Sequence, residues 1–141
     1  MTDSLSSDKK ISDFDFLPQT GEKASDFQLI IDKQTEITYC LVTISKKIIS
    51  NMVTYKNEML KRKKIEHVNI LRLSFMLEDN DNIYFVLENF EGVSLKKYLE
   101  MKKNVPEARL FRIYLQIWMV VEVFHDLKLQ MKDLSVKFKI I

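Results

Sequence analysis

The side chains best able to do chemistry are few in this sequence and widely separated. Its two histidines are His67 and His125, and its only cysteine is Cys40. No group of His, Cys, Asp or Glu has the spacing of a zinc or other metal site, so we predict no bound metal. A single cysteine excludes an intramolecular disulfide and favours a reducing compartment such as the cytosol.

One basic run, Lys61 to Lys64, has two interpretations. It could direct the chain to the nucleus, but a basic helix end beside the negative pole of the helix dipole explains it as well. We therefore predict a cytoplasmic location, with the nucleus as the alternative. The 22 Lys and Arg residues face 20 acids, a net charge of +2 that does not indicate nucleic-acid binding.

The composition is that of a folded chain with room for one domain or part of a larger one. Of 141 residues, 46% are hydrophobic and 30% are charged, which are globular values. The apolar run Ile113 to Phe124 is about a dozen residues long, where a membrane span needs roughly twenty, and it contains Gln116 and Glu122. We predict a buried helix there and no membrane partner. The N-terminus also lacks the apolar segment of a secretory signal.

A small sheet and a few helices must position the candidate residues. Stretches rich in β-branched and aromatic residues, separated by polar turns, predict five strands. These strands are expected within residues 15–39 (two strands, with Gly21 in the turn region), 39–44, 69–75 and 83–87. Residues 50–64 place Met52, Tyr55 and Met59 on one stripe, which predicts an amphipathic helix beside the sheet.

Two further helices are expected in the second half. Residues 93–101 suggest a short helix, and Pro106 opens a long one through about Leu127, because proline is tolerated in the first helical turn. The long helix is apolar nearly all round, which is typical of helices buried on several sides. The fold class predicted is therefore α+β.

This order of elements, with particular residues at particular intervals, resembles the eukaryotic protein kinase family over roughly residues 14–141. The segment Glu66 to Leu99 reads EHVNILRLSFMLEDNDNIYFVLENFEGVSLKKYL. It is similar to the family's His-Pro-Asn-Ile step, two strands, acidic hinge and short helix, with Val68 in place of the proline. The resemblance implies that the gatekeeper and hinge positions are taken by Leu87, Glu88, Asn89 and Phe90.

The segment FHDLKLQMKDLSVKFKII, Phe124 to Ile141, resembles the family's catalytic-loop region. Asp133 stands at the position of the aspartate that accepts a proton from the substrate hydroxyl. The resemblance implies a kinase small lobe over residues 14–87, preceded by a flexible leader at 1–13. It also implies a hinge with part of a large lobe over residues 88–141.

In protein kinases, phosphoryl transfer depends on residues that position the ATP phosphates and stabilise their charge. The sequence differs from the family at several of these residues. Around Gly21 the other phosphate-covering glycines are replaced by residues such as Lys23 and Asp26. Alignment on Cys40 places Val42 where the phosphate-pairing lysine should be. Glu58 matches the helix glutamate that pairs with this lysine, and a solvated helix glutamate is the preferred reading. Rescue of the missing charge by Lys46 is a lesser alternative.

The catalytic-loop positions are also altered. Met131, Lys132 and Ser135 replace the family's His, Arg and Lys, and Phe138 replaces the metal-binding asparagine, whose oxygen a phenyl ring cannot supply. Asp133 is therefore expected to be vestigial, a turn aspartate rather than a base. The sequence stops at Ile141, before the positions of the Asp-Phe-Gly metal site and the peptide-binding half. We expect no cofactor, or ATP with Mg²⁺ if any activity is kept.

In a complete kinase the long helix lies at the centre of the large lobe, covered by elements that this chain lacks. Several uncovered apolar side chains, at about 1.5–3 kcal/mol each, rival the whole stability of a small domain. We therefore expect self-association, a protein partner bound through Leu110 to Phe124, or incomplete folding after Met101.

Three functional hypotheses follow. The first is a catalytically inactive pseudokinase that acts by binding. The second is a weakly active or complemented Ser/Thr protein kinase that transfers phosphate from ATP. The third is a truncated kinase product without a selected function. The sequence favours the first hypothesis over the second, because the lost groups would act together in catalysis.

Overall fold

A computed structural model describes residues 8–18, 28–90, 92–129 and 140. The chain divides into two compact units, each treated by itself. The sheet unit comprises Met1–Lys64 and Arg72–Glu91, and the helical unit comprises Ile65–Leu71 and Gly92–Ile141. No helix among the described residues is both long enough and apolar enough to cross a membrane.

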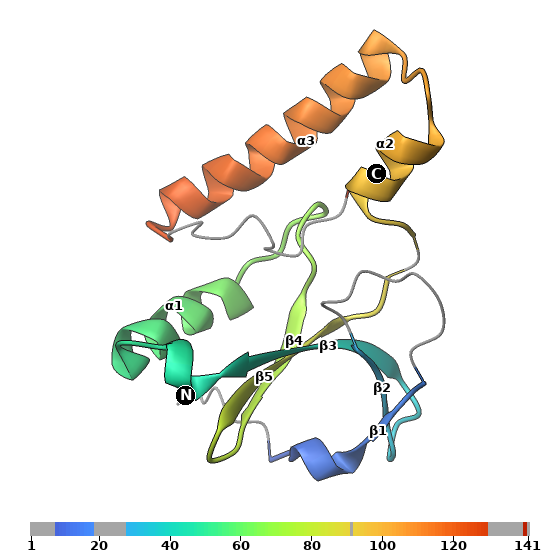
Figure 1. Ribbon diagram of the computed structural model, residues 1–141. Helices are drawn as coiled ribbons and strands as arrows, with labels where there is room; N and C mark the ends of the chain where they lie inside the picture. The colour runs from blue at the N-terminus through green and yellow to red at the C-terminus, as the bar shows by residue number, and fades with distance from the viewer. Residues whose placement is uncertain (1–7, 19–27, 91, 130–139, 141) are drawn as a thin grey trace. The chain divides into compact units, whose positions relative to one another are not determined.

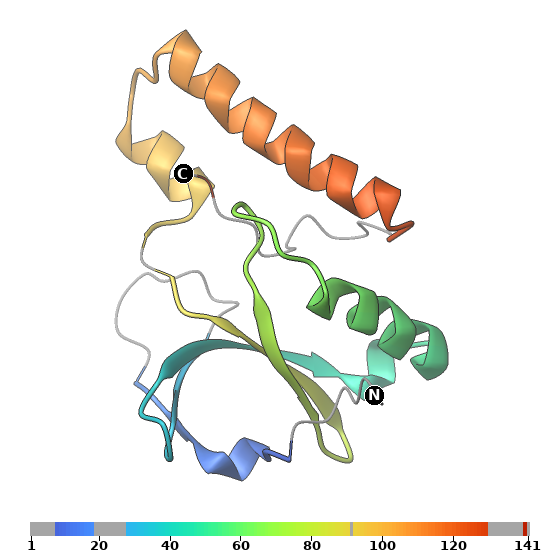
Figure 2. The same ribbon diagram turned by 180° about the vertical axis from the view of Figure 1, so that it is seen from behind.

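The sheet unit is built on five antiparallel strands in the order β1-β2-β3-β5-β4 (Figure 1). The strands are β1 (Phe14–Phe16), β2 (Gln28–Asp32), β3 (Thr38–Ser45), β4 (Leu73–Glu78) and β5 (Asn82–Glu88). Figure 2 shows the sheet curling at its β1–β2 edge. The predicted α+β fold with a five-stranded antiparallel sheet is confirmed.

Helix α1 (Met52–Lys63) covers part of one face of this sheet. The Asn51 side chain caps it by accepting a hydrogen bond from the Thr54 amide at 3.1 Å. The helix ends in the basic residues Lys61 to Lys63, where cations are favoured by the helix dipole. A short 3-10 helix, η2 (Lys46–Ile48), links β3 to the segment before α1.

Strand alternation sorts the sheet residues into two hydrophobic clusters, because neighbouring side chains point to opposite faces. The α1-side cluster contains Met59 of α1 and apolar residues of β3, β4 and β5. Its buried members are Cys40, Met59, Leu73, Met76, Ile83, Phe85 and Leu87. The opposite cluster is formed by Phe14, Ile30, Leu41, Leu77 and Val86.

Strand β4 begins later than the sequence predicts. It spans Leu73–Glu78, whereas residues 69–75 were expected. Asn69 is 97% buried, but it does not pair with another strand of the sheet. Its side-chain nitrogen donates a hydrogen bond to the Gln116 side chain of α3 at 2.7 Å, and Ile70 also packs against α3. Residues 65–71 therefore belong to the helical unit, and none of them is part of a strand of the sheet.

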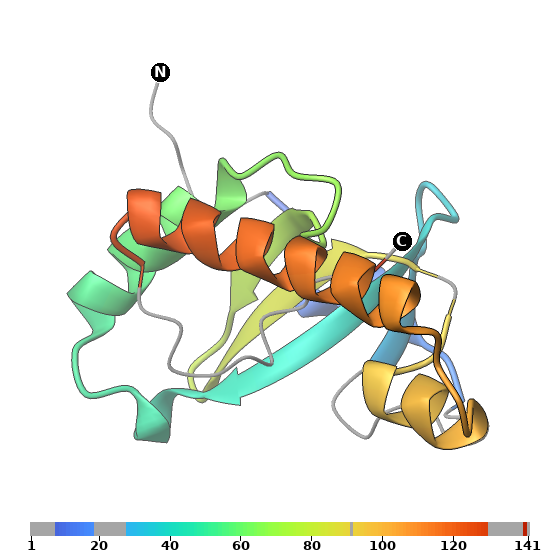
Figure 3. The ribbon, with the colours of Figure 1, turned by 90° about the horizontal axis from the view of Figure 1, so that it is seen from above.

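The helical unit contains α2 (Leu95–Met101) and α3 (Glu107–Asp126), with Pro106 immediately before α3 as the sequence predicts. Figure 3 shows α3 as one continuous helix. Its buried stripe is Ile113, Val120 and Phe124, and the last two pack with Ile70 and Leu129. Residues 8–13, expected to be part of a flexible leader, include the 3-10 helix η1 (Ile11–Asp13).

Candidate functional site

Two of the predicted site residues meet where β3 and β5 lie side by side. Cys40 of β3 pairs with Leu87 of β5, and both side chains are buried in the α1-side cluster. The thiol of Cys40 also lies 3.8 Å from the Asn89 side-chain oxygen, in the geometry of a weak S–H hydrogen bond. These two predicted residues are therefore brought together, and they form an apolar surface.

Val42 lies one step further along the same face. It pairs with Phe85 in the β3–β5 register and packs against the α1-side cluster. This is the face on which Met59 of α1 is buried. The register thus directs the uncharged side chain of Val42 toward α1.

Glu58 projects from α1 and is half-buried. It forms no ion pair with any described lysine or arginine. Its charge instead acts on Arg62, one turn later, whose guanidinium pKa is lowered by burial while Glu58 opposes that shift. Arg62 donates to the Met59 sulfur at 4.0 Å. The glutamate therefore has no lysine partner in the described part of the sheet unit.

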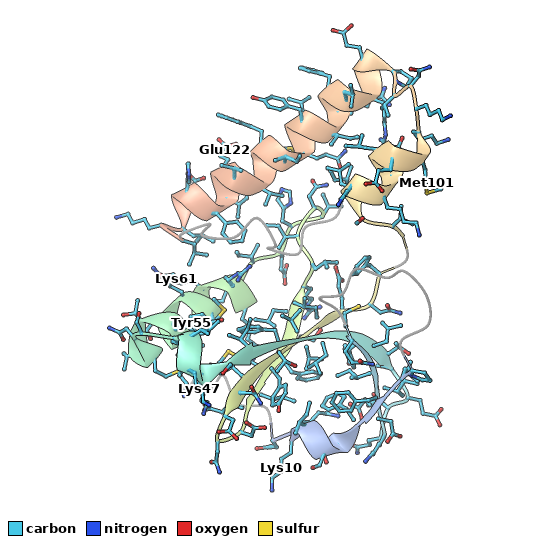
Figure 4. The ribbon with its side chains drawn as sticks, viewed as in Figure 1. Lys10, Lys47, Tyr55, Lys61, Met101 and Glu122 are labelled. Carbon is cyan, nitrogen blue, oxygen red and sulfur yellow. The ribbon has the colours of Figure 1, made fainter. Side chains whose placement is uncertain are left out.

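Tyr55 lies on the same side of α1 as Met59. Its ring centroid is 6.2 Å from that of Phe85, so the two rings join α1 to the sheet. Tyr55 is labelled on α1 in Figure 4. Burial raises the pKa of the Tyr55 phenol. The rings of Tyr55 and Phe85 and the Met59 side chain therefore join α1 to the sheet in the α1-side cluster.

Lys46, the candidate for replacing the missing charge, is held at the other end of β3. Its ammonium lies 3.0 Å from the Glu78 carboxylate, which also binds Lys56 of α1 at 2.9 Å. Hydrogen bonds from Lys56 and Lys46 lower the pKa of Glu78. The Lys46 amide donates to Asp81 in the β4–β5 turn at 2.8 Å. This places Lys46 beside the hairpin turn rather than beside Cys40 and Leu87.

The hinge candidates follow directly from β5. Glu88 pairs with Tyr39, and its amide donates to the Arg72 carbonyl at 2.9 Å. Phe90 is half-buried and packs on the α1-side cluster. Glu88 and Phe90 thus follow Leu87 at the end of β5, and Asn89, which the resemblance also places in this region, contacts Cys40.

Two predicted site residues, Gly21 and Asp133, lie outside the described residues, as do Met131, Lys132, Ser135 and Phe138. Among the described residues there is no group of three or more His, Cys, Asp or Glu side chains able to hold a metal ion. The described site residues therefore offer apolar surface and backbone groups, and they do not supply a clustered set of metal ligands.

The side of α3 opposite its buried stripe is unusually apolar and exposed. The exposed side chains are Leu110, Phe111, Tyr114, Leu115, Trp118 and Met119, here called the α3 patch. A shallow depression lined by Ala108, Leu110, Phe111 and Tyr114 lies at its N-terminal end. Contiguous exposed apolar patches are uncommon on the surface of soluble monomers.

Comparison with known proteins gives the class that this fold and site define. The protein kinase domain family model matches residues 7–137. Calcium-dependent protein kinase 5 of Plasmodium berghei is 31% identical over 105 residues, covering 74% of this chain and 19% of that protein. Serine/threonine-protein kinase Sgk3 of Rattus norvegicus is 27% identical over 131 residues, covering 89% and 26% respectively.

Solved structures agree on the fold. A crystal structure of Rad53 in complex with AMP-PNP has a TM-score of 0.71 and 23% identity, covering 86% of this chain and 33% of that chain. The chain belongs to the protein kinase domain family, and its described elements correspond to the small lobe and the start of the large lobe. It spans about a fifth of the Plasmodium kinase and about a quarter of Sgk3.

Proposed function

We propose that this chain is a kinase-like binding protein that does not transfer phosphate, that is, a pseudokinase. The observation that carries the proposal is the position of Val42 within an apolar cluster beside α1. A lysine ammonium at this place pairs with nucleotide phosphates in active kinases. Valine has neither charge nor hydrogen-bond donor in its side chain.

The neighbouring groups support this proposal. Glu58 forms no ion pair within the described residues, and Lys46 is bound to Glu78 near the hairpin turn. In the catalytic loop, the position of the family's metal-binding asparagine is occupied by Phe138. Since positioning and electrostatic groups contribute orders of magnitude each to the rate, their joint loss removes catalysis.

A thermal-shift titration with ATP, with and without Mg²⁺, tests the proposal. Kinase relatives and the AMP-PNP complex of Rad53 make these the ligands to use. We expect no shift, or a small one that does not depend on Mg²⁺. A large Mg²⁺-dependent shift that disappears in Lys46→Ala would instead support the alternative, an enzyme with a displaced lysine.

The binding activity is proposed to use the α3 patch, and its occupant to be a second copy of this chain. Phe111, Leu115 and Trp118 lie about half a turn from the buried stripe, so a continuous apolar strip faces outward. Exposed Arg112 lies toward one end of this strip, and exposed Glu122 and Asp126 toward the other. An antiparallel pair of α3 helices would bring these opposite charges together while covering both patches.

The fluorescence of Trp118 can report on this association, because Trp118 is the only tryptophan of the sequence and is 57% exposed. We expect its emission to shift to shorter wavelength as protein concentration rises, in step with dimer formation by sedimentation velocity. Leu115→Glu should abolish both changes, whereas Val53→Glu, at an exposed site on α1, should leave them intact. A monomer at all concentrations, or equal effects of the two substitutions, would contradict the dimer.

A further inference from the structure

A buried carboxylate lies at the end of β2, and it is not among the kinase-like residues named above. Asp32, at the end of β2, is only 1% exposed. One of its oxygens accepts backbone hydrogen bonds from Gln34 at 2.9 Å and Thr35 at 3.3 Å. The other forms an ion pair with the ammonium of Lys9. A buried charge of this kind is costly unless it is paired, so the ammonium is a required part of the site.

Aromatic rings form the other wall around the same ammonium. The Lys9 nitrogen lies 5.9 Å from the ring centroid of Phe14 and 5.8 Å from that of Phe75. Tyr39 completes the group, with its ring centroid 6.2 Å from Phe14 and 5.6 Å from Phe75. Three different strands thus supply rings to one place. Cations within about 6 Å of a ring centroid are attracted by its quadrupole.

Lys9 belongs to the segment before β1, and it differs from its lysine neighbour in that segment by reaching the buried carboxylate. Its neighbour Lys10 is exposed and points away from the sheet in Figure 4. The segment is also tied by the Lys33 ammonium, which donates to the Ser12 carbonyl at 2.8 Å, and by the Lys33 amide, which donates to Asp13 at 3.0 Å. Lys9 supplies the charge that reaches the buried carboxylate.

We propose that Asp32, Phe14 and Phe75 form a binding site for an alkylammonium group, with the Lys9 side chain as its resident ligand. The site recognises a lysine side chain by combining a buried carboxylate with ring surfaces, and it fastens residues 8–13 to the sheet. When the charge of Lys9 is removed, the site accepts an external lysine-like ammonium. This proposal is independent of the kinase-like site and of the α3 patch.

The full-length chain carrying Lys9→Ala tests the site, with n-butylammonium as the probe because it matches the lysine side chain. We expect the substitution to lower the Tm by roughly 5–10 °C, since it leaves a buried carboxylate without its charged partner. Millimolar n-butylammonium should restore much of this loss and shift the NMR signals of the Phe14 and Phe75 rings. The uncharged 1-butanol should do neither, and Lys10→Ala should melt with the unmodified chain.

Two further measurements decide the result. Asp32→Asn keeps the oxygen that accepts from Gln34 and Thr35 but loses the charge, so Lys9→Ala/Asp32→Asn should not respond to n-butylammonium. In the unmodified chain, ring currents should move the NMR signals of the Lys9 Hε protons upfield. This measurement does not depend on whether a variant folds. Random-coil Lys9 signals, or an equal n-butylammonium response with and without the Asp32 charge, would overturn the proposal.

Discussion

Val42 of β3 lies opposite Phe85 of β5, and both side chains pack in the cluster that includes Met59 of α1. The antiparallel register determines which face of the sheet each side chain occupies, because a shift by one residue would move every side chain of the strand to the opposite face. Ser45, at the end of β3, is three residues further on, roughly 10 Å along a strand. Lys46 follows it and pairs with Glu78, so its ammonium is held at the far end of β3 from Val42.

The packing of α1 on the sheet gives a first prediction. Met59→Ala should reduce the free energy of unfolding by about 2–5 kcal/mol, because Met59 is 95% buried and its removal leaves a cavity. Val53→Ala on the exposed side of the same helix should change it by no more than about 0.5 kcal/mol. Urea unfolding followed by circular dichroism measures both. Similar losses for the two variants would show that α1 does not pack as described.

The hydrogen bond between Asn69 and Gln116 gives a second prediction. Asn69→Ala should destabilise the helical unit by about 1–3 kcal/mol, because a buried polar contact to α3 is lost. A double-mutant cycle with Gln116→Ala should show a coupling of about 1 kcal/mol. Unfolding can be followed through Trp118, and Asn57→Ala, at an exposed position on α1, is the matched control. Additive effects would contradict the contact.

The pH dependence of Asp32 gives a third prediction. The hydrogen bond from Lys9 lowers the pKa of Asp32 from 3.8 to about 2, despite the opposing effect of burial. A carboxyl whose folded pKa is lowered stabilises the fold above its unfolded pKa, and this contribution is lost as pH falls from about 3.8 to about 2. In Lys9→Met the pKa should rise, so the loss should begin at higher pH. Carbon NMR titration of the Asp32 carboxyl checks this, and an unchanged pKa would contradict it.

The ion pairs of Glu78 give a fourth prediction. Glu78→Gln breaks contacts with Lys46 and Lys56, but the Glu78 side chain is 43% exposed, so the cost should stay below about 1 kcal/mol. The cost should shrink further in about 1 M NaCl, which screens exposed charges. Urea unfolding at low and high salt measures it. A loss that exceeds about 2 kcal/mol and resists salt would mean that these charges are more deeply buried than described.

Much of the fold could be predicted because periodicity is a local signal. The alternation in residues 39–44 and 83–87 reported two strands correctly, and Pro106 marked the start of α3. The start of β4 was predicted wrongly, because Asn69 is hydrogen-bonded to Gln116, 47 residues further along the chain. A contact between residues so far apart in the sequence cannot be predicted from a local pattern.

The candidate site was predicted only in part for a related reason. The family resemblance singled out Cys40, Val42, Leu87 and Phe90, which lie in one cluster, and their place at a nucleotide site stays a prediction. The ammonium site was missed because Lys9 and Asp32 lie 23 residues apart in stretches that resemble a leader and a polar turn. Asn89 stands among the hinge positions of the resemblance, but its contact with Cys40, 49 residues away in the sequence, was not predicted.

Transfer of labelled γ-phosphate from ATP tests the central claim most directly. The full chain is incubated with ATP, Mg²⁺ and a general protein substrate, beside the variant Asp133→Asn. We predict that both proteins give the same signal as a reaction without enzyme. Mg²⁺-dependent labelling that Asp133→Asn removes would contradict the claim that this chain has lost phosphoryl transfer.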